Sequence, residues 1–147
     1  RLKVVAGSKK SVKLKSGRLI VTVPKSTKNK DRYIKDALTS WYREHALTKL
    51  LAKVRRYSKI LGVDPEFVGI RTFKGRWGSC SSKGKLEFNW KIIIAPTQIV
   101  DYIVIHELCH LIHHNHGPKF WKSVERACPN FRQQNEWLRV HGRMLDV

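Results

Sequence analysis

The sequence predicts an α+β fold in a single domain over residues 1–147. The length of 147 residues is that of one ordinary domain, and 41% of the residues are hydrophobic, enough to bury a core. Apolar and polar residues alternate in several short segments, which is typical of strands with one buried face. In longer segments the apolar residues recur every three or four positions, which is typical of amphipathic helices. No apolar run reaches the roughly 20 residues that a membrane-spanning helix needs, so we expect no membrane partner.

A basic hairpin is predicted near the start of the chain. The segment "VKLKSGRLIVTVP" has the pattern of two strands joined by a turn at Ser16-Gly17, with apolar residues at alternate positions before Pro24. Residues 1–30 contain ten Lys and Arg and no Asp or Glu, and the net charge of the chain is +19. Such a surface attracts polyanions, so we expect nucleic acid or a nucleotide as a partner, with a role in solubility as the alternative.

A long helix is predicted from Asp31 to about Leu61. Its apolar residues fall at three- and four-residue steps, with a shift of phase near His45. Gly62 supplies the stop. We expect the hairpin and this helix, residues 1–62, to form a basic N-terminal part, and residues 63–147 to form the core that holds the functional site.

The remaining elements alternate between strands and helices. "FVGIRTF" predicts a strand, "KGRWGSCSSKGK" a loop rich in Gly and Ser, and "LEFNWKIII" a second strand that extends to Ile94. Pro96-Thr97 opens a helix that is predicted to run to about Asn115. Further helices are predicted over residues 119–127 and in the tail "FRQQNEWLRVHGRML".

The segment "VIHELCHLIHHNHG" contains the pattern H-E-x-x-H, at His106, Glu107 and His110. On a helix, residues four apart lie on the same face, so the two imidazoles can reach one zinc ion. Glu107 is one residue away from His106, close enough to act as a general base on a water molecule without binding the metal. The helix around these residues is apolar on almost all sides, which predicts that it is buried.

A catalytic zinc ion needs a third protein ligand and one open position. We expect one Zn²⁺ per chain and favour His116 as the third ligand, because the chain turns back at Gly117-Pro118 directly after it. His113 and Glu125 are the alternatives. His113 continues the predicted helix, and Glu125 lies on the following one.

Two further residues are candidates for binding negative charge. Arg76, in the Gly- and Ser-rich loop, can grip a carboxylate or phosphate or stabilise an oxyanion, and a structural salt bridge is the alternative. His141, near the C-terminus, can assist an oxyanion, and a surface or capping role is the alternative. Trp77 is predicted to be a packing anchor, and Cys80 a buried thiol rather than a nucleophile.

Together the segments "RWGSCSSKGKLEFNWKIIIAP", "DYIVIHELCHLIHHNHGPKFW" and "WLRVHG" resemble the YgjP-like metallopeptidase domain family, which is related to SprT-like and WLM-type zinc proteases. The resemblance implies a zincin-like fold, with a twisted, mostly antiparallel sheet packed on the helix that carries the first two metal ligands. It also implies that His116 is the third ligand. In such folds an edge strand receives the substrate backbone, which points to residues 86–94 and makes Asn89 and Trp90 candidate substrate-binding residues.

The leading hypothesis is therefore a zinc-dependent peptidase that acts on a peptide or protein, near nucleic acid if the basic surface binds it. One alternative is a metal-dependent hydrolase of nucleotides or phosphate esters that uses the same site. Another is a non-catalytic, basic module that binds nucleic acid and contains a structural zinc ion. The odd count and wide spacing of the cysteines, Cys80, Cys109 and Cys128, favour a reducing compartment, so a cytoplasmic location is expected.

Overall fold

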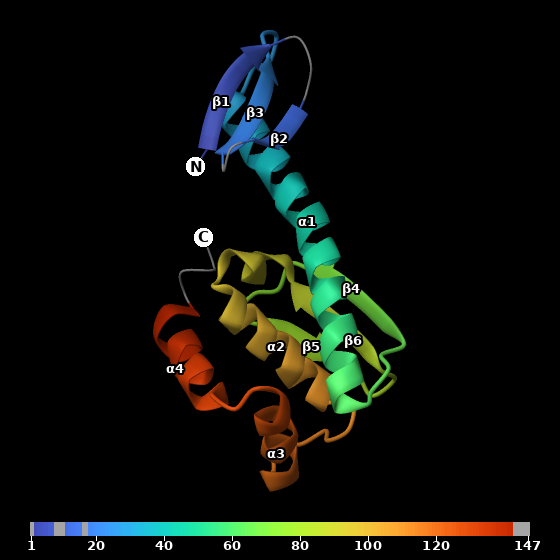
Figure 1. Cartoon of the computed structure of the whole chain (residues 1–147). Helices are drawn as coiled ribbons and strands as arrows, with labels where there is room; N and C mark the ends of the chain where they lie inside the picture. Colours follow the sequence, from blue (N-terminus) through green and yellow to red (C-terminus); the bar gives the residue numbers. More distant parts are fainter. Residues whose placement is uncertain (1, 8–10, 16–17, 143–147) are drawn as a thin grey trace. The chain divides into compact units, whose positions relative to one another are not determined.

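The computed structural model describes residues 2–7, 11–15 and 18–142 of the chain (Figure 1). The predicted turn at Ser16-Gly17 lies outside the described residues. The fold is α+β, with two small sheets and four α-helices among the described residues. The chain divides into two compact units, Arg1–Glu44 and His45–Val147. This boundary coincides with the predicted shift of apolar phase near His45. The assignment of one domain to the whole chain stays a prediction.

The first unit contains a three-stranded sheet with the order β1-β3-β2. Its strands are β1 (Leu2–Gly7), β2 (Ser11–Lys15) and β3 (Arg18–Pro24). The hairpin of β2 and β3 is confirmed as antiparallel, but β1, which the sequence did not predict, pairs with β3 in parallel. Residues 2–6 are all exposed, so β1 has no buried face and lacks the alternation that identifies a strand.

The long helix α1 spans Lys30–Leu61. It begins where the Asn29 side chain accepts a hydrogen bond from the backbone N–H of Arg32, at 3.1 Å. It ends at Gly62, whose φ of 71° favours glycine, as predicted. Its first half belongs to the first unit, where Ala37 packs with Val21 and Val23 of β3. Its second half belongs to the second unit.

The second unit contains another three-stranded sheet, with the order β4-β6-β5. Its strands are β4 (Phe67–Arg71), β5 (Gly78–Cys80) and β6 (Lys85–Asn89). β6 pairs with β4 in parallel and with β5 antiparallel. In both sheets the third strand inserts between the first two, so each sheet is mixed and the prediction of a mostly antiparallel sheet is wrong. β5 lies within the segment that was predicted to be a loop.

The predicted strand 85–94 is correct only as far as Asn89. A short 3₁₀-helix, η1 (Trp90–Ile94), follows β6. The Asn89 side chain accepts a hydrogen bond from the backbone N–H of Lys91, at 3.2 Å, and so starts the helical turn. β6 is also the central strand of its sheet, so the prediction that residues 86–94 form an open edge is wrong.

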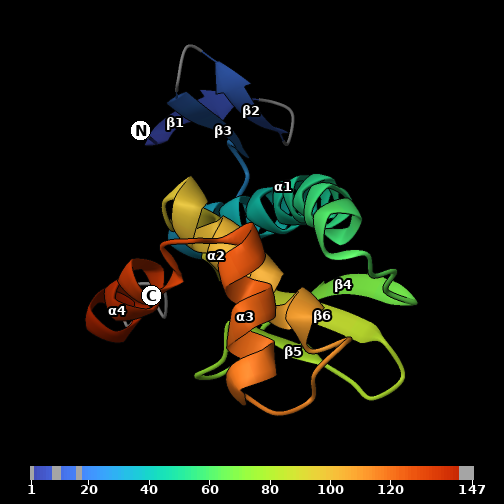
Figure 2. The same cartoon turned by 60° about the horizontal axis from the view of Figure 1, so that its bottom comes forward.

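Three helices complete the second unit: α2 (Thr97–Cys109), α3 (Pro118–Ala127) and α4 (Phe131–His141). In Figure 2, α2 lies beside the second half of α1, where Lys53 and Asp101 form an ion pair of 2.5 Å. α2 is buried on most sides, as predicted. Within the described residues, no helix has both the length and the apolar character to cross a membrane.

α2 ends at Cys109, earlier than the predicted end near Asn115. The backbone N–H groups of His110, Leu111 and Ile112 each bond to the carbonyl three residues earlier, which tightens the last turn. The N–H of His113 still bonds to the Cys109 carbonyl at 2.9 Å, and the His113 carbonyl accepts a hydrogen bond from the His110 ring at 3.1 Å. This early end allows the chain to turn back toward α2.

Candidate functional site

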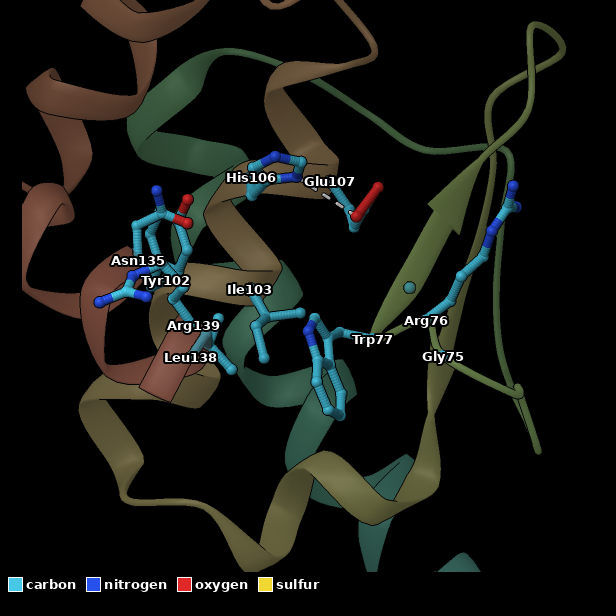
Figure 3. A pocket seen from close by; sticks show the side chains of 11 residues that line it. Gly75, Arg76, Trp77, Tyr102, Ile103, His106, Glu107, Asn135, Leu138 and Arg139 are labelled. Carbon is cyan, nitrogen blue, oxygen red and sulfur yellow. Dashed lines mark hydrogen bonds and ion pairs between the residues drawn. The ribbon is translucent and has the colours of Figure 1, made fainter. Parts of the chain in front are cut away.

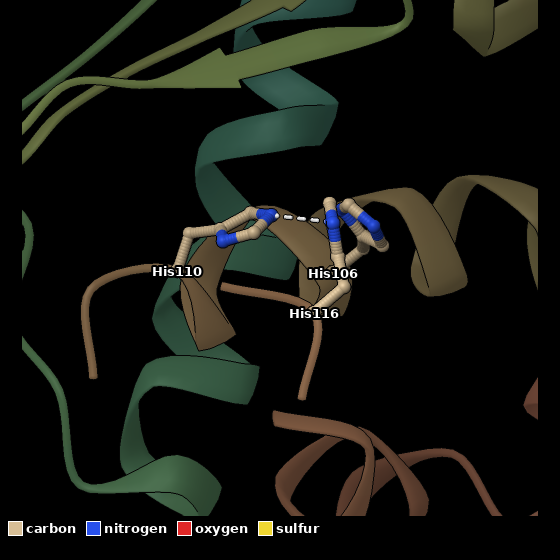
Figure 4. A group of neighbouring side chains, drawn as sticks. All are labelled: His106, His110 and His116. Carbon is tan, nitrogen blue, oxygen red and sulfur yellow. Dashed lines mark hydrogen bonds between the residues drawn. The ribbon is translucent and has the colours of Figure 1, made fainter. Parts of the chain in front are cut away.

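Three histidine side chains converge at the C-terminal end of α2. His106 and His110 lie one helical turn apart, and the segment after α2 returns His116 to them (Figure 4). One ligand nitrogen from each ring lies within 4.8 Å of the others, and Nε2 of His110 is 3.0 Å from Nε2 of His116. Among the described residues, this is the one group of three or more metal-ligating side chains that are close enough to share an ion.

The surroundings of His110 prepare its ring to bind a metal. When Nδ1 donates its proton to the His113 carbonyl, the lone pair of Nε2 is left facing His116. Burial lowers the pKa of His110, and the neighbouring His106 and His116 rings lower it further, while the His113 carbonyl and Glu107 oppose the shift. The lowered pKa favours the neutral ring, which is the form that binds a cation.

Two aromatic residues of α3 support the three imidazoles from one side. The ring of Phe120, which is fully buried, lies 5.1 Å from His106, 4.6 Å from His110 and 4.9 Å from His116, centroid to centroid. Trp121 stacks on His116 and donates a hydrogen bond from Nε1 to the His116 carbonyl, at 3.1 Å. Neither residue was predicted from the sequence, because nothing in the local pattern shows that α3 folds back under α2.

The three imidazoles fit a zinc ion. Nitrogens bound to one tetrahedral zinc ion lie about 3.3 Å apart, given Zn–N bonds of about 2.0–2.1 Å. The His110–His116 nitrogen pair is already near this separation at 3.0 Å. A set of three histidines leaves one tetrahedral position open, as in catalytic zinc sites.

Glu107 lies beside the three histidines on the side that faces the sheet. It is 7% exposed, and its Oε2 is 3.3 Å from Nδ1 of His106. Gly78 of β5 gives it room, since a Cβ at that position would lie 3.0 Å from Cγ of Glu107. The carboxylate is thus held between α2 and β5 without being part of the histidine group.

A pocket of about 460 Å³ opens next to Glu107 and His106 (Figure 3). The loop before β5 contributes one wall, α2 a second and α4 a third. The side chains that line it come from Arg76, Trp77, Tyr102, Ile103, Asn135, Leu138 and Arg139, besides His106 and Glu107. Tyr102 and Ile103 precede His106 and Glu107 by four residues, so helical spacing alone could have identified them. No sequence pattern indicated the residues from α4.

Asn89 and Trp90 hold the loop that forms one wall of this pocket. Asn89 is fully buried, and its side-chain amide donates to the carbonyls of Phe73, at 3.2 Å, and Arg76, at 3.0 Å. Trp90 donates from Nε1 to the Thr72 hydroxyl, at 3.1 Å. Neither residue lines the pocket, so both are placed to support the loop. Their direct contact with a substrate stays a prediction.

The other predicted site residues lie apart from the three histidines. Arg76 is exposed at the rim of the pocket, and its side chain extends away from Glu107 (Figure 3). Glu125 is exposed on α3, and His141 is exposed with its ring 5.0 Å from that of Trp137. His113 contributes its carbonyl, not its ring, to the group.

Cys80 does not have the properties of a nucleophile. Burial, with a further contribution from the negative charge of Glu107, raises the pKa of its thiol to about 11. The thiol is therefore protonated at neutral pH, whereas a catalytic cysteine needs a lowered pKa.

Comparisons with known proteins place the chain among metallopeptidases. The chain is 25% identical to the metallopeptidase zymogen abylysin of Pyrococcus abyssi, with 64% of this chain and 93% of that chain covered and a TM-score of 0.57. A second match is the metallopeptidase zymogen jannalysin of Methanocaldococcus jannaschii, at 21% identity, with 58% and 91% covered and a TM-score of 0.49. No curated protein matches the chain. The model of the YgjP-like metallopeptidase domain matches residues 1–141, so the chain belongs to the YgjP-like metallopeptidase family.

Proposed function

We propose that this chain is a zinc-dependent peptidase in which His106, His110 and His116 bind the metal and Glu107 is the general base. The observation that supports this most strongly is the convergence of three imidazoles beside the buried carboxylate of Glu107, which lines a pocket. The family adds the reaction class, hydrolysis of peptide bonds.

Each residue has a defined role in this proposal. A bound zinc ion supplies Lewis acidity, which polarises a carbonyl and lowers the pKa of a water molecule. Glu107 accepts a proton from the attacking water and then delivers it to the amine that leaves. Phe120 excludes water from the far side of the histidines, and the His113 carbonyl keeps the His110 ring in one orientation.

The proposed strand that receives the substrate backbone is β5 rather than β6. Among the described strands β5 pairs only with β6, and it lies next to α2 and Glu107. An extended peptide that pairs with the free edge of β5 would pass directly by the carboxylate.

Gly78→Ala is expected to lower kcat by about tenfold while zinc remains bound, because a displacement of Glu107 by a fraction of an ångström weakens catalysis. The added Cβ would lie 3.0 Å from Cγ of Glu107 and 3.2 Å from the Glu87 carbonyl. Steady-state kinetics and zinc content would measure both effects. Ser82→Ala is the control, since Ser82 is exposed in the turn after β5 and does not line this pocket. Equal kcat in the two variants would contradict this role of Gly78.

Hydrolysis of phosphate esters is the competing activity for the same site. Zinc-loaded protein should cleave peptides from a mixed library and leave nucleoside triphosphates intact, as followed by mass spectrometry. Release of phosphate or pyrophosphate without peptide cleavage would contradict the proposal. Sites for phosphate hydrolysis with two metals usually contain several carboxylates, whereas Glu107 is the one carboxylate among the described residues that line this pocket.

We further propose that the peptidase acts near nucleic acid, which binds the outer face of the first sheet. Lys3 of β1 and Lys13 of β2 both pair with Ile20 of β3, so the three side chains lie side by side on one face of the sheet. Arg18 lies two residues before Ile20 on β3 and therefore points to the same face. All three cationic side chains are exposed, and residues 1–30 contain no acidic residue to neutralise them. The face has the charge that phosphate backbones attract.

The variant in which Lys3, Lys13 and Arg18 are all changed to Gln should bind duplex DNA with a weaker salt dependence. Each lost phosphate contact reduces the slope of log K against log salt by about 0.9, so the slope should change by up to about 2.7. Fluorescence anisotropy at several salt concentrations measures this slope. The control removes the same charge at Lys59, Lys83 and Lys122, which are exposed in the second unit. An equal change in both variants would mean that binding follows net charge alone.

A further inference from the structure

The pocket beside Glu107 has an apolar interior. Trp77, Ile103 and Leu138 approach one another in it from the loop, α2 and α4 (Figure 3). Ile103 and Tyr102 are 3% exposed. Apolar side chains that surround a cavity favour an apolar ligand, because its transfer from water is favourable. The volume of about 460 Å³ is within the usual range for small-ligand sites, roughly 300–1,000 Å³.

The wall formed by Trp77 is held in place from two directions. The backbone N–H of Asn89 donates to the Trp77 carbonyl at 2.8 Å, so the loop is bonded to the end of β6. On the other side the indole packs against Gly142, where a Cβ would lie 2.8 Å from Cζ2 of Trp77. An aromatic wall fixed at both its backbone and its ring can discriminate ligands by size.

The charged groups around the pocket do not favour an acidic side chain. Arg139 donates from Nε and Nη2 to the two carboxylate oxygens of Glu136, at 3.0 and 2.5 Å, so its guanidinium is paired on the surface of α4. The Arg76 side chain extends away from Glu107 (Figure 3). Glu107 itself would repel an acidic side chain. Asn135 is left as a neutral polar group at the edge.

We infer that this pocket receives the substrate side chain next to the scissile bond and selects a large apolar residue, with Leu138, Ile103 and Trp77 as the residues that determine specificity. The inference rests on the proposed peptidase function and names its substrate class. Selection depends on α4, which contributes neither a metal ligand nor the general base. The residues that determine specificity are thus different from the residues that bind the metal and transfer the proton.

The inference is tested by measuring kcat/KM for a set of peptides that differ only in the residues flanking the scissile bond. The zinc-loaded protein is expected to cleave next to Phe or Leu with kcat/KM at least about tenfold higher than next to Ala, Asp or Lys, because a hydrophobic pocket distinguishes side chains of different size by that much. Leu138→Trp, which fills the pocket, should remove this preference, and Leu138→Ala should extend it to Trp. Val140→Ala is the matched control on α4, since Val140 is 56% exposed and does not line the pocket. An unchanged ranking in both folded, zinc-loaded Leu138 variants would overturn the inference.

A binding measurement separates this inference from the proposed activity. Zinc-loaded Glu107→Gln protein should bind the Phe peptide at least about tenfold more tightly than the Ala peptide by calorimetry, and Leu138→Trp in the same background should abolish the difference. Equal affinities for the two peptides would overturn the pocket assignment even if peptides are cleaved. A clear preference together with no cleavage by the unsubstituted protein would support the pocket and contradict the peptidase function.

Discussion

Glu107→Gln is expected to retain zinc and to lose peptide hydrolysis by about 10²–10⁴-fold, the usual contribution of a general base. The amide keeps the size of the side chain but cannot take up the proton of the attacking water. Glu107 lies outside the group of three histidines, so the proposed metal ligands are unchanged. Kinetics with a quenched fluorescent peptide, together with zinc content measured by mass spectrometry, test both halves of this expectation.

Glu125→Gln is the matched control for this experiment. Glu125 is exposed on α3 and was an alternative third ligand on the basis of sequence. The Glu125→Gln variant should retain both its zinc and its peptidase activity. If Glu107→Gln turned over peptides at the original rate, the assignment of the general base would be wrong. If Glu125→Gln lost its zinc, the ligand set would be wrong instead.

His116→Ala is expected to weaken zinc binding by more than about 100-fold, since even the loss of an outer partner of a ligand costs 10–100-fold. The remaining two histidines, His106 and His110, cannot supply the three ligands that a catalytic zinc ion usually has. Competition with a chromogenic chelator measures the affinity. The same loss should appear in thermal unfolding, because a metal that binds only the folded protein raises its stability in proportion to log affinity.

His114→Ala is the control for the loss of an imidazole. His114 is two residues away from His116 but is exposed and lies outside the histidine group. Its substitution should leave the chelator curve and the zinc-dependent rise in Tm as they are. A similar loss of affinity in both variants would indicate diffuse binding by the histidine-rich segment rather than a defined site.

Local spacing determined the part of the site that lies within one helix. His106 and His110 are four residues apart, and in any α-helix such residues share a face, so their proximity did not depend on the rest of the fold. The turn at Gly117-Pro118 also made the return of His116 predictable. The start of α2 at Pro96-Thr97 and the end of α1 at Gly62 were predictable for the same reason, because caps and stops act over a few residues.

Only the tertiary structure decided which elements meet. The alternation in "LEFNWKIII" predicted one strand, but it could not reveal that Asn89 would start a 3₁₀ turn or that β6 would lie at the centre of its sheet. The Phe120 ring under the histidines, the Gly78 contact with Glu107 and the Leu138 wall of the pocket join residues from different elements. Periodicity in a sequence predicts which face of an element is buried. Which other element covers that face depends on long-range packing, which the periodicity does not show. The grouping of the three histidines was therefore predictable from the sequence, while the pocket beside them required the fold.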